Sequence, residues 1–299
     1  MYSDLLLVES KIPPRIAEKL KEIGRNVAPP PTEALYAPQQ RREPYPGIKV
    51  LRDQSYGNHS RNLLDVFAPE GVNAGNRPVL MFVHGGAFAR GDRRAGPNSP
   101  FYDNIMIWAA ENGMVGVNMT YRLAPEFQWP AAQEDIASAI HWVKANIAVD
   151  GGDPDRIYLM GHSAGAAHVA QYIGHRQFQP NADPGLAGAI MISGLFDPAT
   201  ANDPTMALYF GVDRSVYSER SALPGLATST LPMLFAHAEL DPDTFHQQGD
   251  EARRELGKNG SGRHEFILLQ GHSHMSEVFS INSEDTALTG YIRRFIFDR

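Results

Sequence analysis

The sequence has no cysteine among its 299 residues, which excludes disulfides, thiolate nucleophiles, iron–sulfur clusters and cysteine-type zinc sites. No apolar run approaches the ~20 residues that a membrane helix needs. The short run 5–8 follows no basic segment and is interrupted by Glu9, so we expect no signal peptide. Positive charge is also scarce, since 27 Lys and Arg against 34 Asp and Glu give a net charge of −7. This balance argues against a nucleic-acid partner, and we expect a cytoplasmic protein without a membrane span.

What the sequence does have is ordinary globular composition, with 42% hydrophobic and 20% charged residues. Continuous apolar runs are typical of strands that are covered on both faces, and they occur at residues 78–83, 114–119, 156–160, 189–192, 233–236 and 266–269. Helical patterns separate these runs, for example Ile136, Ile140 and Val143 on one face. The alternation predicts a single α/β domain over residues 1–299, with a mostly parallel central sheet of about eight strands and helices on both faces.

Two segments stand outside this alternation. Residues 14–27 carry an apolar helical stripe, and we expect the prolines at 29–31 to end that helix and begin an extended linker. Residues 198–228 hold several aromatics and prolines and look like an insertion. We expect residues 1–45 and 198–228 to form a small cap. The helical stripe packs on the body or meets a second copy, so a homodimer stays open.

A serine flanked by glycines forms the clearest motif, Gly161-His162-Ser163-Ala164-Gly165. It follows the predicted strand 156–160 and precedes a helix-compatible stretch. A serine on a tight strand-to-helix turn projects its hydroxyl above the sheet, and small neighbours tolerate the strained backbone. The context predicts that Ser163 is a nucleophile rather than a solvated turn residue.

A glycine-rich segment, His84-Gly85-Gly86-Ala87-Phe88, directly follows the predicted strand 78–83. Acyl transfer builds negative charge on a carbonyl oxygen, and backbone N–H groups aimed at that oxygen stabilise it. We expect the N–H groups of Gly86, Ala87 and Ala164 to form such an oxyanion hole. We expect His84 to be a hydrogen-bonded structural residue.

Together these motifs resemble the α/β-hydrolase fold and, within it, the hormone-sensitive-lipase-like carboxylesterases. The stretch Tyr121-Arg122-Leu123-Ala124-Pro125-Glu126 and the residues at 130–135 are similar to that family's signature. The resemblance runs from about residue 48 to the C-terminus. Ala87 departs from it where a third glycine is usual, and His162 departs where an acidic residue is common. Residues 161–165 and 241–247 are also similar to kynurenine formamidases.

The resemblance implies that an acid and then a histidine follow Ser163 in chain order. Asp241 comes after the predicted strand 233–236 and matches the family's acid, with Glu239 and Asp243 as rivals.

The base should lie in the loop after the predicted strand 266–269, where His272 and His274 compete. His274 fits the family better, because Met275 and Ser276 follow it. A His-x-His pair is also compatible with a metal site that uses Asp241, but we expect no metal and no cofactor.

The resemblance implies a serine carboxylesterase that hydrolyses small to medium acyl or aryl esters through an acyl-enzyme. Candidate pocket walls are Phe88, Trp129, Tyr209 and Phe210. Two alternatives stay open. One is an arylformamidase that acts on N-formyl aromatic amines, and the other is a non-catalytic ligand-binding protein with this fold.

Overall fold

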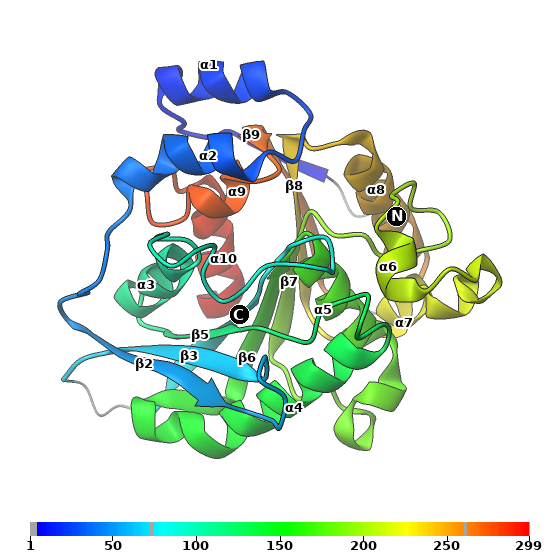
Figure 1. The fold of residues 1–299 in the computed structure, drawn as a ribbon, viewed down its shortest axis with the longest axis horizontal. Helices are drawn as coiled ribbons and strands as arrows, with labels where there is room; N and C mark the ends of the chain where they lie inside the picture. The colour runs from blue at the N-terminus through cyan, green and yellow to red at the C-terminus, as the bar shows by residue number, and fades with distance from the viewer. Residues whose placement is uncertain (1–4, 72–74, 260–261, 299) are drawn as a thin grey trace.

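The computed structural model describes residues 5–71, 75–259 and 262–298. Within these ranges one sheet of nine strands has the order β1-β9-β8-β7-β6-β4-β5-β3-β2 (Figure 1). All neighbours pair in parallel except β2 with β3 and β3 with β5. The strands are β1 (Leu5–Val8), β2 (Ile48–Ser55), β3 (Leu63–Pro69), β4 (Arg77–Val83), β5 (Val115–Met119), β6 (Gly152–His162), β7 (Gly188–Ile192), β8 (Met233–Leu240) and β9 (His264–Ser273).

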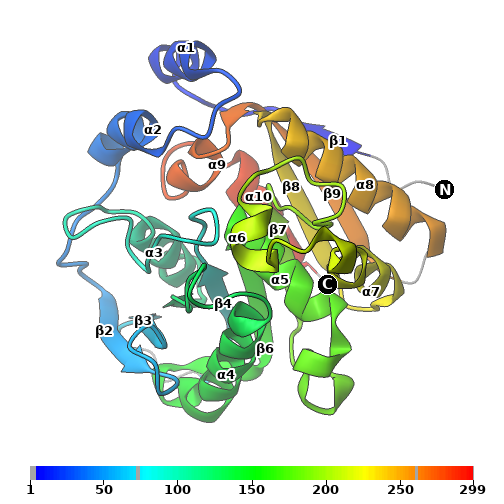
Figure 2. The same cartoon turned by 45° about the vertical axis from the view of Figure 1, so that its right-hand side comes forward.

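Helices cover both faces of this sheet (Figures 1 and 2). One core lies under α4 (Ala131–Asn146), α5 (Ala164–Gly174), α7 (Leu223–Thr228) and α8 (Asp243–Asn259). The other core lies under α3 (Asp103–Glu111), α9 (Ser276–Phe279) and α10 (Ala287–Phe297). The predicted fold class is therefore confirmed, with one strand more than expected. Over the described part of the chain, no helix combines the length and the apolar character that crossing a membrane requires.

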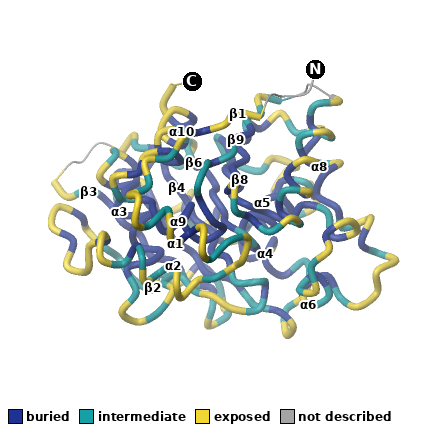
Figure 3. Tube along the Cα trace, turned by 90° about the horizontal axis from the view of Figure 1, so that it is seen from above, coloured by how far each residue is buried: buried dark blue, intermediate teal, exposed yellow. Residues whose placement is uncertain are grey.

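Burial on both faces explains why the sequences of the central strands are apolar at every position. In β4, Val79, Met81 and Val83 point into the first core, while Leu80 and Phe82 point into the second. Successive side chains of a strand face opposite sides, so a central strand needs apolar residues at every position. Figure 3 shows the sheet as the buried centre of the molecule.

The N-terminal segment joins the two edges of the sheet. β1 pairs with β9 at one edge, and β2 forms the opposite edge. Between them, α1 (Pro14–Ile23) and α2 (Pro29–Tyr36) pass over the top of the sheet as it is drawn in Figure 1. We call residues 9–47 the N-terminal strap.

The expected extended linker at residues 29–31 is wrong, because Pro29 begins α2. Proline is favoured in the first helical turn, where its missing N–H would have no partner in any case. The preceding helix ends at Ile23, four residues earlier than its apolar stripe suggested, since Gly24 has a φ of 65°.

Residues 198–228 contain no strand, in line with their broken pattern. They form α6 (Met206–Phe210), two short turns of 3-10 helix, and α7. The 3-10 turns of the described chain are Ala37–Gln39, Ile147–Asp150, Arg176–Phe178, Pro180–Ala182, Arg214–Val216 and Ser218–Arg220.

Candidate active site

Ser163 occupies a sharp turn between the end of β6 and the start of α5. Its φ and ψ are 57° and −124°, a strained conformation for a residue with a Cβ. The flanking glycines are sterically required. A Cβ on Gly161 would lie 2.5 Å from the carbonyl oxygen of Gly165, and a Cβ on Gly165 would lie 2.1 Å from that of Val83. Ser163 is nevertheless partly exposed and lines a cavity.

The loop after β4 lies against this turn, since a Cβ on Gly85 would come within 3.1 Å of the Cβ of Ser163. Gly86, Ala87 and Phe88 have φ angles of 132°, 50° and 65°. Strained residues of this kind persist where the surrounding structure holds them, and they concentrate at functional sites.

The N–H groups of the three predicted oxyanion donors have no backbone acceptor of their own in the described part of the chain and are available to a ligand oxygen. Within the described ranges, the N–H groups of Gly86 and Ala87 donate to no backbone acceptor. Ala164 is the first residue of α5, and the first N–H groups of a helix have no partner inside it.

His84 supports this loop. Its Nδ1 lies 2.7 Å from the carbonyl oxygen of Gly85, and its Nε2 lies 2.8 Å from Oγ1 of Thr120. Its ring stacks on Tyr121 with 4.5 Å between centroids. Burial lowers the pKa of His84 to about 4, so the ring is neutral at pH 7. These contacts agree with the structural role expected from the sequence.

Asp241 and His274 are hydrogen-bonded to each other, with 2.7 Å between Oδ1 and Nδ1. Asp241 follows β8 and His274 follows β9, and both side chains are fully buried. The other carboxylate oxygen, Oδ2, accepts from the N–H of Ala238 at 3.0 Å and from Oγ of Ser193 at 2.5 Å. These bonds fix both sides of the carboxylate.

The charges of this pair follow from its contacts. Burial by itself raises the pKa of Asp241, but its interactions with His274, His237 and Ser193, above all the hydrogen bond from His274, outweigh burial and hold the pKa below its usual value. An ionised carboxylate can only accept, so Nδ1 of His274 carries the proton. Nε2 of His274 has no hydrogen-bond partner among the residues that the structure describes. Its lone pair is available to take a proton.

The ring of His274 lies beside the turn that carries Ser163. Its centroid is 4.8 Å from that of His162, the residue before the serine, and 4.3 Å from that of Phe245. Both neighbours line the same cavity as Ser163. The structure thus brings the predicted nucleophile, acid and base to one end of the sheet, after β6, β8 and β9.

The rival residues are engaged elsewhere. His272 has both ring nitrogens occupied, at 2.9 Å from Oγ of Ser276 and 2.9 Å from Oδ2 of Asp285. Glu239 accepts the N–H of Gly271 at 2.7 Å. The side chain of Asp243 is 88% exposed.

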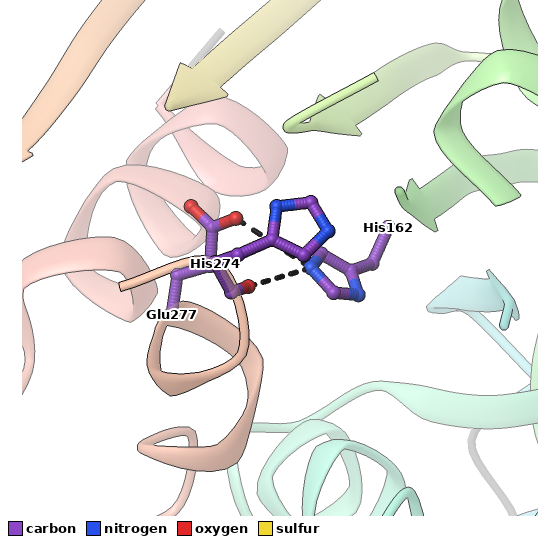
Figure 4. Close-up of side chains that lie close together, drawn as sticks. All are labelled: His162, His274 and Glu277. Carbon is purple, nitrogen blue, oxygen red and sulfur yellow. Dashed lines mark hydrogen bonds and ion pairs between the residues drawn. The ribbon is translucent and has the colours of Figure 1, made fainter. Parts of the chain in front are cut away.

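Sequence reasoning missed three buried polar residues around His274, namely Ser193, His162 and Glu277. His162 Nε2 lies 2.8 Å from the carbonyl oxygen of His274 and 3.6 Å from Oε1 of Glu277. Figure 4 shows the Glu277 carboxyl beside both imidazoles. Ser193 directly follows β7, so its position at a strand end is a signal that was available. Glu277 carries no comparable signal.

His162, His274 and Glu277 are also the residues that could hold a metal ion. One nitrogen or oxygen from each lies within 4.8 Å of the others. However, His274 is hydrogen-bonded to Asp241, and His162 is hydrogen-bonded to the carbonyl of His274. A cation would have to compete with these bonds.

The cavity at Ser163 has a volume of about 460 Å³, within the usual range for small-molecule sites. The strap contributes Val27, Pro29, Pro30 and Glu33 to its wall, and residues 198–228 contribute Asp203 and Thr205.

The four predicted wall residues divide into two groups. Phe88 lines the cavity, whereas Trp129, Tyr209 and Phe210 are not among its lining residues. Tyr209 stacks behind Phe88 at 5.2 Å, and Trp129 packs on His175 at 5.7 Å between ring centroids.

Comparison with known proteins places this geometry in context. Residues 64–191 match the family model BD-FAE. Esterase LipQ of Mycobacterium tuberculosis is 35% identical over 202 residues, which are 64% of this chain and 46% of LipQ. The versiconal hemiacetal acetate esterase of Dothistroma septosporum is 26% identical over 210 residues, which are 68% of this chain and 61% of that enzyme. The chain thus spans about half the length of the curated relatives it matches.

Solved structures share the fold at low sequence identity. A hyperthermophilic esterase from Pyrobaculum calidifontis superposes with a TM-score of 0.69 at 20% identity, covering 96% of this chain and 98% of that one. Inhibited esterase B from Lactobacillus rhamnosis also gives a TM-score of 0.69, at 16% identity, covering 88% of this chain and 90% of that one.

The sheet, the serine turn and these structural neighbours define an α/β-hydrolase fold. Within this fold, the family model matched over residues 64–191 and the esterase relatives fit the predicted resemblance to hormone-sensitive-lipase-like carboxylesterases. The similarity to kynurenine formamidases stays a prediction.

Proposed function

We propose that this chain is a serine carboxylesterase with Ser163 as nucleophile, His274 as base and Asp241 as acid. The observation that carries the proposal is the Asp241–His274 hydrogen bond of 2.7 Å, which leaves Nε2 of His274 without a partner among the described residues. The curated relatives reported above are named as esterases, which supports this reaction over the arylformamidase and ligand-binding alternatives.

In the first half of the reaction, Oγ of Ser163 attacks the ester carbonyl carbon, and Nε2 of His274 takes its proton. Asp241 holds the ring in the tautomer that has a free Nε2 and stabilises the imidazolium that forms. The N–H groups of Gly86, Ala87 and Ala164 bind the oxygen of the tetrahedral intermediate. Each donor contributes about 3 kcal/mol to transition-state stabilisation in comparable sites.

In the second half, the imidazolium of His274 protonates the leaving alcohol, and an ester to Ser163 remains. His274 then takes a proton from water and the hydroxide attacks the acyl-enzyme; as the bond from the acyl carbon to Oγ breaks, His274 returns its proton to Oγ of Ser163 and the acid is released. This sequence needs no cofactor.

The substrate we propose is a small to medium acyl or aryl ester. The cavity of about 460 Å³ and its walls from the strap and from residues 198–228 support this size limit. The name of the Dothistroma septosporum relative, an acetate esterase, also favours a short acyl group. The cap role of the two segments, a homodimer and a cytoplasmic location remain part of the same prediction.

Ser163→Ala tests the proposal. We expect the variant to lose about 10⁶-fold in kcat on p-nitrophenyl butyrate, because the nucleophile of a triad cannot be replaced by its partners. A phosphonate probe should label Ser163 in the unsubstituted protein, as read by mass spectrometry of its peptide. Retained esterase activity in the variant, or faster turnover of N-formylkynurenine than of any ester, would contradict the proposal.

A further inference from the structure

Glu277 is a buried carboxyl that the catalytic scheme above does not use. It lies in the short helix α9, three residues after His274, and its side chain is fully buried. Neither carboxyl oxygen forms a hydrogen bond of ordinary geometry with the residues that the structure describes, although the Ser193 hydroxyl acts on this carboxyl as a donor and lowers its pKa. Leaving a buried polar group unpaired is costly, so the position of this carboxyl calls for an explanation.

The groups that face Glu277 come from the ends of four strands, of which β7 contributes Ser193. His162 ends β6 and lies 3.6 Å from Oε1 of Glu277, and a ring nitrogen of His274, after β9, lies within 4.8 Å (Figure 4). Asp241, after β8, acts on Glu277 through its charge. His237 in β8 acts on Asp241 and His274 in turn.

The charge states of these groups leave a single negative charge. Burial lowers the pKa of His162 to about 3 and that of His237 to about 4, so both rings are neutral at pH 7. Burial and the charge of Asp241 raise the pKa of Glu277 well above its usual value, so this carboxyl holds its proton to a higher pH than an ordinary glutamate does. Two carboxyls in one buried site cannot easily ionise together.

We propose that Asp241 and Glu277 are a carboxyl pair that shares one negative charge, and that Glu277 is a second acid which ionises and stabilises the His274 imidazolium when the charge of Asp241 is removed. The inference rests on the proposed triad. Glu277 releases its proton to water before substrate binds, and His274 then takes the proton of Ser163 as before. Glu277 is a positioning residue, because it acts on the reaction only through His274.

The test is a double-mutant cycle on p-nitrophenyl butyrate hydrolysis. Asp241→Ala removes the charge without placing a new donor beside Nδ1 of His274. We expect Glu277→Gln to lower kcat/KM at least tenfold more in the Asp241→Ala background than in the unsubstituted protein, since one pKa unit at His274 corresponds to a tenfold change. Equal losses in the two backgrounds would mean that Glu277 is only structural, and would overturn the proposal.

Asp285→Asn is the matched control, because Asp285 is also a buried carboxyl paired with a histidine, His272. Asp285→Asn should lower kcat/KM by the same factor in the unsubstituted protein and in Asp241→Ala. The pH profile adds a readout that a structural role would not move. In Asp241→Ala, kcat/KM should show an ionisation that disappears in the double variant. If Glu277→Gln does not fold, as judged by its melting curve, Glu277→Met takes its place.

Histidine NMR separates this inference from the proposed function. We expect the pKa of the His274 ring to be at least one unit lower in Asp241→Ala/Glu277→Gln than in Asp241→Ala, whether or not esters are hydrolysed. An unchanged pKa would overturn the inference alone. An inactive unsubstituted protein with the expected NMR shift would overturn only the esterase assignment.

Discussion

The two oxygens of Asp241 have different neighbours, and this difference predicts which of two Asp241 variants is the less active. Oδ2 accepts from the N–H of Ala238, which can only donate. In Asp241→Asn the amide oxygen must therefore stay at that position, and the NH₂ group turns toward Nδ1 of His274. The ring is then forced to carry its proton on Nε2, where it cannot act as a base.

We therefore expect Asp241→Asn to lose about 10⁴-fold in kcat and to be less active than Asp241→Ala. The kcat of each variant on p-nitrophenyl butyrate tests this comparison. An asparagine variant more active than the alanine variant would show that the amide does not take this orientation.

Glu277 also affects stability in a pH-dependent way. Its pKa is raised well above 4.5 in the folded protein. Between pH 4.5 and this raised pKa, the folded state therefore holds a proton that the unfolded chain has released. The free energy of unfolding therefore falls as pH rises through this window, by up to about 1.4 kcal/mol per pH unit.

Glu277→Gln removes this dependence, because the amide does not titrate. We expect the variant to gain stability relative to the unsubstituted protein as pH increases from about 4.5. Urea unfolding at a series of pH values measures the difference. A difference that is constant with pH would show that Glu277 ionises normally in the folded protein.

Residues within one local motif could be predicted, whereas those held by distant segments could not. The Ser163 turn and the glycine-rich loop with the proposed donors Gly86 and Ala87 are encoded by glycine patterns after strands, because the backbone there needs small residues. Asp241 was proposed from the chain order that the family resemblance implies and from its place after a strand. Glu277 could not be predicted, since its environment comes from β6 and from the loop after β8, far away in sequence.

At the scale of elements, the loop after β4 depends on its glycines, and most strictly on Gly86. Gly86 has a φ of 132°, and a Cβ there would lie 1.9 Å from the carbonyl oxygen of Arg90. We expect Gly86→Ala to move the loop and lower kcat at least 10²-fold, the usual cost of losing one oxyanion donor.

KM should change far less than kcat, because the other cavity walls are untouched. Gly113→Ala is the control, since Gly113 also has a positive φ, of 79°, but nothing lies within 4 Å of its added Cβ. If both variants lose activity equally, general backbone strain rather than the oxyanion loop explains the loss.

Buried strands were predictable as elements, whereas the short edge strand β1 was not. Central strands such as β4 contact two cores, so their sequences are uniformly apolar. β1 has only four residues, of which Leu7 is 63% exposed, and no local pattern distinguishes it from a coil. The second helix of the strap was missed because the prolines at 29–31 were interpreted as the end of a helix. Proline is also favoured in the first turn of a helix, which is where Pro29 lies.

At the scale of the whole molecule, the strap is fixed at both edges of the sheet. Removing residues 1–8 eliminates β1 and frees one end of the segment that contributes Pro29 and Pro30 to the cavity wall. We expect kcat/KM on p-nitrophenyl dodecanoate to rise at least threefold relative to the butyrate, because a looser wall admits a longer acyl chain.

The matched control is Leu7→Ser, which changes a largely exposed side chain and keeps the backbone pairing of β1. Its preference for acyl length should equal that of the unsubstituted protein. An unchanged preference in the shortened chain would mean that the strap does not limit substrate size.

Attachment at both edges of the sheet also has a kinetic consequence. A cover with a single hinge can swing through solvent, and its opening then limits turnover in many enzymes. The strap has a strand pairing at each end, so we expect substrate to enter and product to leave without a large motion of the strap. Turnover should therefore respond little to added viscogens such as sucrose.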